Sequence, residues 1–474
     1  MSVTATSPAP PPAARSRAPG AAIAIASAAT FVAFLDVTVV NVALPDLQRH
    51  FPQDSLVALS WVVAVYGVVF AALLAPAGRL ADVLGRKAVF LGGFAAFTLT
   101  SALCALAPSV PLLIAARALQ GAGAAFMIPA ALGIVLAVAA PERRAAAVGL
   151  WGATTSIAAA TGPALGGLLI DAFDWRAVFL INVPIGLAVL WAGARLLPAL
   201  RLGARQLPDL LGSLLLAAGA ALVLVALTET AQWGWADART LVCAAVGGLL
   251  LAVVWRRTRS HPAPALETDL WRNRSYAAAS VAAGVYGLAL FAWMLACVLF
   301  VTGVWGYSIV EAGLAVTPGA LTSAVGAVLA GRAVERRGPA PVVAAGAALF
   351  ALAGAWCVAG IGTQPDFLGF WLPLGLLAGA GIGVATVGIN AAAVGAVPPE
   401  RFAAGTALMM TARQFGGALG VALLATLLDA GDGSIGSFRG VFGICAGAAA
   451  LTLLCAPWLA RSSAPITTTA AVTR

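Results

Sequence analysis

The chain has 474 residues, of which 61% are hydrophobic and only 9% are charged. Soluble domains carry roughly 25% charged residues, so this composition excludes an ordinary soluble protein. The net charge of +9 does not gather into a basic patch or arm, which argues against nucleic acid as a partner.

The chain has few of the residues from which a metal centre or an enzyme site is built. The two histidines, His50 and His261, lie in polar connectors, and the six cysteines lie in apolar stretches without a Cys-x-x-Cys pair. We therefore expect packing cysteines, no metal and no cofactor. Lys87 follows an arginine and not a glycine, so it is not part of a Walker A loop. If this protein pumps a substrate, an ion gradient must supply the energy.

Apolar stretches long enough to span a membrane follow one another along the chain. Residues 1–20 are rich in Pro, Ala and Ser and are predicted to be a disordered tail. The next apolar run is too long for a signal peptide, so we expect an uncleaved first helix. The predicted spans are residues 21–45, 56–76, 88–107, 111–139, 146–170, 177–197, 210–228, 240–255, 275–303, 310–330, 341–361, 367–397, 404–428 and 440–460.

The basic residues lie mainly on one side of these spans. Of the 27 lysines and arginines, 21 lie on the side of the N-terminus and 4 on the other, while Arg117 and Arg413 lie within spans. This asymmetry follows the positive-inside rule. It predicts a multi-pass protein of the cell (inner or plasma) membrane with both termini in the cytoplasm.

Two loop motifs recur in the same order in the two parts of the chain. The first occurrence is Gly78, Arg79, Asp82 and Gly85, and the second, with the same spacing, is Gly331, Arg332, Glu335 and Gly338. A Pro-Glu-Arg triplet also recurs at 141–143 and 399–401. Parallel repeats of this kind are typical of transporters with a substrate cavity between two halves.

The repeat predicts an all-α integral membrane fold with two six-helix halves and two inserted helices. The predicted segments are a cytoplasmic tail (1–20), the N-terminal half (21–200), the inserted helices with their linker (201–274), the C-terminal half (275–460) and a second tail (461–474).

Several motifs match one family of transporters. They are the loop motif at 78–87, LDVTVVNVALP at 35–45, the set Arg117, Gln120, Gly121 and Gly123, the pairs Gly162-Pro163 and Gly166-Gly167, and FLINVPIG at 179–186. The chain resembles the major facilitator superfamily, specifically its fourteen-span drug:proton antiporter branch. It departs from that pattern at Val83, where arginine is usual, and at Ala158, where glycine is usual.

Charges inside spans are costly and are candidates for function. Asp36 and Arg117 are expected at about 13 Å and about 9 Å from the outer face, at 1.5 Å per helical residue. The resemblance places their helices in one half. We predict that Asp36 carries the coupled proton and that Arg117 tunes its proton affinity. Alternatively, the two form a fixed structural ion pair or cap.

The resemblance implies roles for two further sets of residues. A conformational latch is expected at Gly78, Arg79, Asp82, Gly85, Arg86 and Lys87. An antiporter motif that bends the fifth helix is expected at Gly162, Pro163, Gly166 and Gly167. The simpler alternatives are a positive-inside topology signal for the first set and close packing of small residues for the second.

A substrate cavity is expected where aromatic and amide side chains face the centre of the bundle. The candidates are Asn41, Trp61, Tyr66, Gln120, Trp151, Trp293, Asn390 and Arg413. Some of them could instead pack between helices or face lipid, and Arg413 could instead stabilise the opposite half. Glu311 is interpreted as an interfacial charge at a helix N-terminus.

The predicted function is proton-coupled export of hydrophobic or amphipathic drugs and antibiotics. The alternative is a dedicated exporter of one endogenous secondary metabolite or lipid. A membrane enzyme would need a cluster of reactive side chains at one membrane face, which this sequence does not offer. A receptor or channel would not explain the repeated motifs. The expected partners are a small-molecule substrate, protons and the lipid bilayer, and we expect a monomer.

Overall fold

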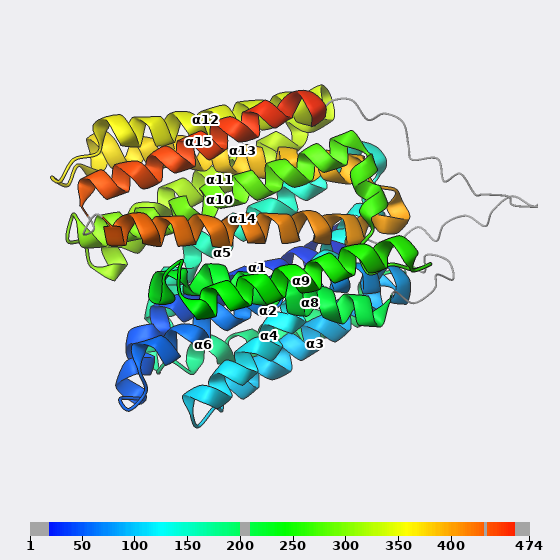
Figure 1. Ribbon diagram of the computed structural model, residues 1–474, viewed down its shortest axis with the longest axis horizontal. Coiled ribbons are helices and arrows are strands. Elements are labelled where there is room, and N and C mark those ends of the chain that lie inside the picture. Colours follow the sequence, from blue (N-terminus) through cyan, green and yellow to red (C-terminus); the bar gives the residue numbers. More distant parts are fainter. Residues whose placement is uncertain (1–18, 200–208, 431–433, 460–474) are drawn as a thin grey trace, which may run out of the picture.

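The structure is a computed structural model, and it describes residues 19–199, 209–430 and 434–459. Figure 1 shows long helices running roughly parallel in a single bundle. The helices of the first half are α1 (Pro19–His50), α2 (Leu56–Leu84), α3 (Arg86–Ala105), α4 (Val110–Val138), α5 (Arg144–Ala172), α6 (Ala177–Leu180) and α7 (Asn182–Leu196).

Eight further α-helices lie in the rest of the described chain. They are α8 (Leu210–Trp233), α9 (Ala238–Ser260), α10 (Arg274–Gly303), α11 (Ile309–Arg337), α12 (Pro339–Gly360), α13 (Leu372–Gly395), α14 (Phe402–Ala430) and α15 (Ile435–Leu459). Short 3-10 or π turns lie at 141–143, 268–272, 367–371 and 399–401. The two predicted tails and residues 201–208 of the predicted linker lie largely or wholly outside the described residues.

The number of spans agrees with the sequence prediction. Within the described residues, 13 helices are long and apolar enough to cross a membrane, with α6 and α7 together making the sixth span. The bent pair 141–162 and 165–172, which meet at 43°, supplies the fourteenth. The expected all-helical membrane fold with about fourteen spans is therefore confirmed.

The repeated loop motif ends two helices in the same way. Gly85 closes α2 with φ of 98°, and Gly338 closes α11 with φ of 78°. Only glycine adopts such positive φ angles without strain, so it allows the chain to turn sharply into the next helix. Each glycine of the repeat thus lets a span end and the next span begin at once.

The two halves contact each other mainly through two pairs of helices, α2 with α14 and α5 with α11. We call the end of the bundle at which α1 begins and α2 ends the basic end. A Cβ on Gly78 would lie 2.4 Å from Ala407, and one on Gly149 would lie 2.6 Å from the carbonyl oxygen of Ala327. Glycine at these positions lets the helices of the two halves approach closely near the basic end.

The inserted helices α8 and α9 form a pair beside the boundary between the halves. In Figure 1 they lie in green, with α8 packed against both α2 and α14. Asp209 caps α8 and forms an ion pair with Arg257 of α9. The hydrogen bonds from Arg257 hold the pKa of Asp209 below its ordinary value.

Candidate functional site

A buried ion pair between α1 and α4 is the centre of the candidate site. The Arg117 Nη1 donates to Asp36 Oδ2 at 2.5 Å, and each residue is 1% exposed. The structure thus brings together the two charges that the sequence predicted at similar depth. A buried pair needs further hydrogen bonds to offset desolvation, and the surrounding side chains provide them.

Two amides hold the carboxylate from its other side and share a hydroxyl group as a second acceptor. Gln120 Nε2 and Asn182 Nδ2 donate to Asp36 Oδ1 at 3.0 and 2.9 Å. Both amides also donate to Ser101 Oγ, at 3.0 and 2.9 Å respectively. The network thus joins α1, α3, α4 and α7. Sequence reasoning placed Asn182 in a family motif without a role and missed Ser101 entirely.

The guanidinium of Arg117 is enclosed by aromatic rings and by the backbone. It lies 4.4 Å from the ring centroid of Tyr66 and 5.7 Å from that of Phe179, and its Nε donates to the carbonyl of Val62 at 3.0 Å. Cation–π attraction and the hydrogen bond to the backbone offset part of the cost of burying this guanidinium. The Asp36–Arg117 pair is therefore sealed from solvent in this conformation.

A second cluster joins the two halves at the basic end. Arg86 donates to Asp82 Oδ1 through Nε and Nη2, at 3.0 and 2.8 Å. Asp82 Oδ2 accepts the backbone N–H of Ala404 at 2.8 Å, and Arg86 Nη2 donates to the carbonyl of Pro399 at 2.5 Å. A carboxylate at the free N–H groups of a helix start is electrostatically favourable. These contacts tie α2 and α3 to the beginning of α14.

The second copy of the motif makes the corresponding contact from the second half to the first. Glu335 Oε1 of α11 accepts the backbone N–H of Ala146 at 3.1 Å, at the beginning of α5. A Cβ on Gly331 would lie 2.8 Å from Ala146 Cα, so the glycine is needed for this approach. The two halves are joined at the basic end by a pair of reciprocal contacts.

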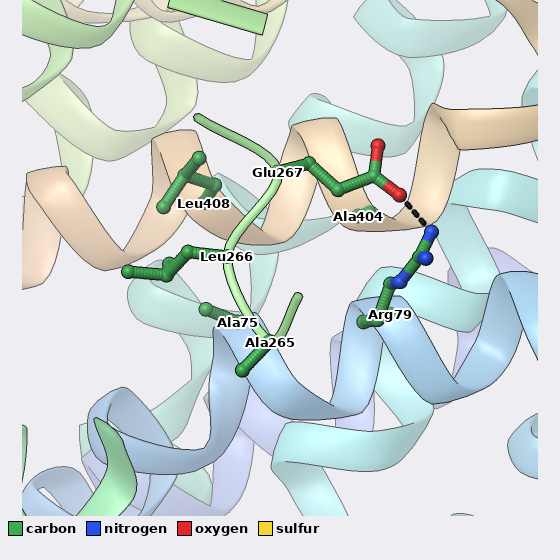
Figure 2. Close-up of a pocket in the computed structure, with 7 residues that line it drawn as sticks. All are labelled: Ala75, Arg79, Ala265, Leu266, Glu267, Ala404 and Leu408. Carbon is green, nitrogen blue, oxygen red and sulfur yellow. Dashed lines mark hydrogen bonds and ion pairs between the residues drawn. The ribbon is translucent and has the colours of Figure 1, made fainter. Parts of the chain in front are cut away.

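The linker after α9 adds a carboxylate that sequence reasoning did not single out. Glu267 is 8% exposed and forms an ion pair with Arg79 of α2, as Figure 2 shows. Its second carboxylate oxygen lies 3.3 Å from Nε of Arg401, just before α14. One side chain from the inserted region therefore bridges an arginine of each half.

The remaining latch and antiporter-motif residues take varied positions. Lys87 Nζ donates to the carbonyls of Ala194 and Leu197 at 2.8 and 2.7 Å, so it ties α3 to α7. A Cβ on Gly162 would lie 1.9 Å from Oγ1 of Thr38, whereas one on Gly167 would meet nothing within 4 Å. On Gly166 it would lie 3.2 Å from Val39. The side chain of Pro163 lies outside the described part of the chain.

Most of the predicted cavity aromatics are engaged in packing. Trp151 donates its Nε1 to Thr30 Oγ1 at 2.8 Å, and Trp293 stacks edge-on against Phe350 and Phe442. Tyr66 and Gln120 belong to the ion-pair network described above.

Two amides and a tryptophan of the predicted cavity set take different positions. Trp61 is half-buried, Asn41 is exposed on α1, and Asn390 is buried with no hydrogen-bond partner for its Nδ2. Asn41 donates its Nδ2 to the carbonyl of Val37 at 2.8 Å.

Arg413 lies near the middle of α14, and its Nε is buried without a hydrogen-bond partner. The residue keeps partial exposure as a whole. A Cβ on Gly287 of α10 would lie 2.9 Å from Cγ of Arg413, so this glycine makes room for the arginine stem. The chain thus builds a close fit around a charged side chain in the interior of the second half.

Comparison with known proteins gives a consistent picture. The family model described as Major Facilitator Superfamily matches residues 26–268 and 279–472. The chain is 34% identical over 409 residues to a multidrug resistance protein B homolog of Mycobacterium tuberculosis, covering 84% of this chain and 74% of that one. It is 37% identical over 422 residues to the cephamycin export protein of Amycolatopsis lactamdurans, covering 88% and 86% respectively.

A solved structure shares the fold at low sequence identity. The human organic anion transporter MFSD10 superposes with a TM-score of 0.67 at 14% identity, over 94% of this chain and 100% of the other. At that identity the likeness concerns the fold alone.

Proposed function

This chain belongs to the Major Facilitator Superfamily, in the branch that includes multidrug resistance and antibiotic export proteins, and from that premise we propose proton-coupled export. It is a multi-pass membrane transporter. Its proposed substrates are hydrophobic or amphipathic drugs or antibiotics, moved across the cell membrane in exchange for protons. The positive-inside asymmetry supports assigning the basic end and both termini to the cytoplasm.

The observation that carries proton coupling is the state of Asp36. It is a carboxylate within the apolar interior, 1% exposed and held by Arg117, Gln120 and Asn182. Intramembrane acids of this kind serve as proton relays in transporters. When Asp36 takes up a proton, its ion pair with Arg117 loses the charge that holds it, and α1 and α4 are released from each other.

The contacts at the basic end support a role in alternating access. Asp82, Glu335 and Glu267 each join one half to the other or to the linker, and all act at the same end of the bundle. We assign these contacts to the state that is closed to the cytoplasm. Their separation would open the substrate cavity to the cytoplasm by rocking of the halves.

Gly162 supports the antiporter role through packing. It lets α5 contact α1 at Thr38, two residues from Asp36 along the helix. In this proposal the tight α1–α5 contact limits proton leakage along the bundle. The bend in α5 lies within the same glycine-rich motif, between residues 162 and 165.

A dedicated exporter of one secondary metabolite is the second candidate. The name of the Amycolatopsis relative specifies a single antibiotic class, and this relative is 37% identical over 88% of the chain. The two candidates share the mechanism and differ in how many compounds trigger proton flux.

One experiment tests the function and separates the two candidates. The purified protein is reconstituted in vesicles with an imposed pH gradient, and internal pH is followed while hydrophobic antibiotics and dyes are added one by one. Proton flux triggered by several compounds supports a multidrug exporter, and flux triggered by one compound supports the dedicated exporter. Absence of flux with every compound contradicts proton coupling.

A further inference from the structure

We infer that Arg413 is a recognition site for an anionic group on the substrate, so that the transported compounds include amphipathic acids bearing a carboxylate or an acidic phenol. This inference rests on the proposed export function and specifies its substrate class.

Each of the three buried arginines of the described chain has a carboxylate partner. Arg117 is paired with Asp36, Arg86 with Asp82 and Arg79 with Glu267. Among the described residues, none of the ion pairs includes Arg413. The arginine therefore leaves an uncompensated positive charge in the interior of the bundle.

An unpaired charge at this depth is costly. Arg413 is eleven residues beyond Phe402, where α14 begins, which is about 17 Å along the helix at 1.5 Å per residue. A charge near the middle of the bilayer is expensive unless it is paired or reaches water. A structural role normally brings a carboxylate or carbonyl oxygen to such a group, as the other three arginines show.

The residues around Arg413 pack against its aliphatic stem but offer no hydrogen-bond acceptor to its Nε. On α10, Gly287 admits the Cγ of Arg413, and Gly284 admits the backbone of Gly416, where a Cβ on Gly416 would lie 1.8 Å from the Gly284 carbonyl. The hydroxyl group of Tyr286, on the same helix, bonds Ile382 and Thr386 at 2.8 and 2.9 Å. Nearby polar groups thus bond each other and leave the Nε of Arg413 without an acceptor.

The position of α14 explains where an anion could reach the arginine. This helix packs against α2, α4, α8, α10, α13 and α15, so it is surrounded by protein on most sides. Arg413 retains partial exposure, and in this proposal that exposure faces the interior between the halves. Because guanidinium groups bind carboxylates strongly and often bidentately, an acidic substrate is the ligand that completes this site.

The test uses two dyes that differ in one group. Rhodamine B carries a free carboxylate, and rhodamine B ethyl ester has the same ring system with that group esterified. Binding of each to the purified protein is followed by fluorescence polarisation, for the wild type, Arg413→Gln, Arg413→Lys and Arg239→Gln. Arg239 is an exposed arginine near the end of the bundle opposite the basic end, and its substitution serves as the matched control.

The wild type is expected to bind the free acid more tightly than the ester. Arg413→Gln should weaken binding of the acid about 10- to 100-fold, the range for loss of a hydrogen bond to a charged group, and should leave the ester unchanged. Arg413→Lys keeps the charge and should retain part of the preference, and Arg239→Gln should retain all of it. Equal affinity of the wild type for both dyes, no binding of the acid, or a preference that survives in Arg413→Gln would each overturn the inference.

Thermal unfolding of the same variants separates recognition from a structural role. Removing a charge that has no partner should leave the midpoint of Arg413→Gln unchanged or raised. A marked drop would show that the arginine holds the fold and would count against the inference. The binding assay needs no pH gradient, so it tests the inference separately from proton coupling. If the protein binds the acid through Arg413 but moves no protons, the proposed function is contradicted and the inference about Arg413 is not.

Discussion

The carboxylate of Asp82 accepts the backbone N–H of Ala404 at 2.8 Å, and this contact joins the end of α2 to the beginning of α14. Its counterpart joins Glu335 of α11 to Ala146 of α5 at 3.1 Å. Both carboxylates lie on the last turn of a helix that ends at a positive-φ glycine. The repeat seen in the sequence is thus used twice, once in each direction, to hold the halves together at the basic end.

Asp82→Asn is expected to loosen both reciprocal contacts and not only its own. The halves separate as bodies in alternating access, so weakening one contact raises the population in which both are broken. Amide hydrogen exchange should become faster at Ala404, by about 10- to 100-fold for loss of a charge-assisted hydrogen bond, and also faster at Ala146.

Exchange measured by mass spectrometry on the purified protein tests this coupling. Glu142→Gln is the control, because Glu142 is exposed in the turn before α5. Faster exchange confined to Ala404 would show that the contact is local and would contradict a shared opening motion.

Glu267→Gln is expected to destabilise the protein and to open the basic end. The substitution removes the charge of Glu267 from its ion pair with Arg79, and breaking a buried ion pair from one side costs about 3–5 kcal/mol. The melting temperature should fall, and exchange at Ala404 should rise as it does for Asp82→Asn. Asp269→Asn, an exposed position two residues further along the linker, should change neither. If Glu267→Gln changes the melting temperature and the exchange at Ala404 no more than Asp269→Asn does, the inserted region takes no part in closure.

Gly162→Ala is expected to destabilise the protein, whereas Gly167→Ala is expected to be neutral. The added methyl on Gly162 would overlap the Thr38 side chain, while that on Gly167 would meet open space. Overpacking of this kind typically costs about 1–3 kcal/mol. Thermal unfolding of the two variants provides the measurement. Thr38→Ala combined with Gly162→Ala removes the overlap with Oγ1 but leaves the Thr38 Cβ at 2.6 Å, so it should recover only part of the stability. No recovery at all would place the strain elsewhere.

Asn182→Ala is expected to reduce the maximal rate of proton-driven transport without changing the substrate concentration at half-maximal rate. Asn182 donates to Asp36 and to Ser101, and it is therefore expected to orient the carboxylate. Its loss should disturb proton exchange and spare substrate binding. A change in half-maximal concentration with an unchanged maximal rate would instead assign Asn182 to the substrate site.

Much of the architecture could be predicted from the sequence because membrane spans leave a strong physical signal. Apolar stretches of span length, charges on one side and the repeated glycine motifs led to the helix number and the family. The proximity of Asp36 and Arg117 was expected from their similar depths together with the family resemblance, which placed their helices in one half. The boundaries of the five predicted segments and the roles of the site residues remain predictions.

The parts that the sequence did not reveal depend on contacts between distant residues. Ser101 is one small polar residue among many in apolar helices, and only the fold brings it to Asp36 through Gln120 and Asn182. Glu267 lies in an irregular linker, where a carboxylate is normally solvated, yet the linker folds back between α2 and α14. Trp151 and Trp293 looked like cavity residues, because hydrophobic composition does not separate packing aromatics from those that bind substrate.

The most direct test of the account is proton flux in vesicles for Asp36→Asn. The amide keeps the size and much of the hydrogen bonding of the carboxylate but cannot carry a proton at neutral pH. With a compound that triggers flux in the wild type, Asp36→Asn should give only the flux of protein-free vesicles. Asp171→Asn, at an exposed acid near the end of α5, should give full flux. Substrate-dependent proton flux that persists in Asp36→Asn would contradict the assignment of Asp36 as the proton carrier.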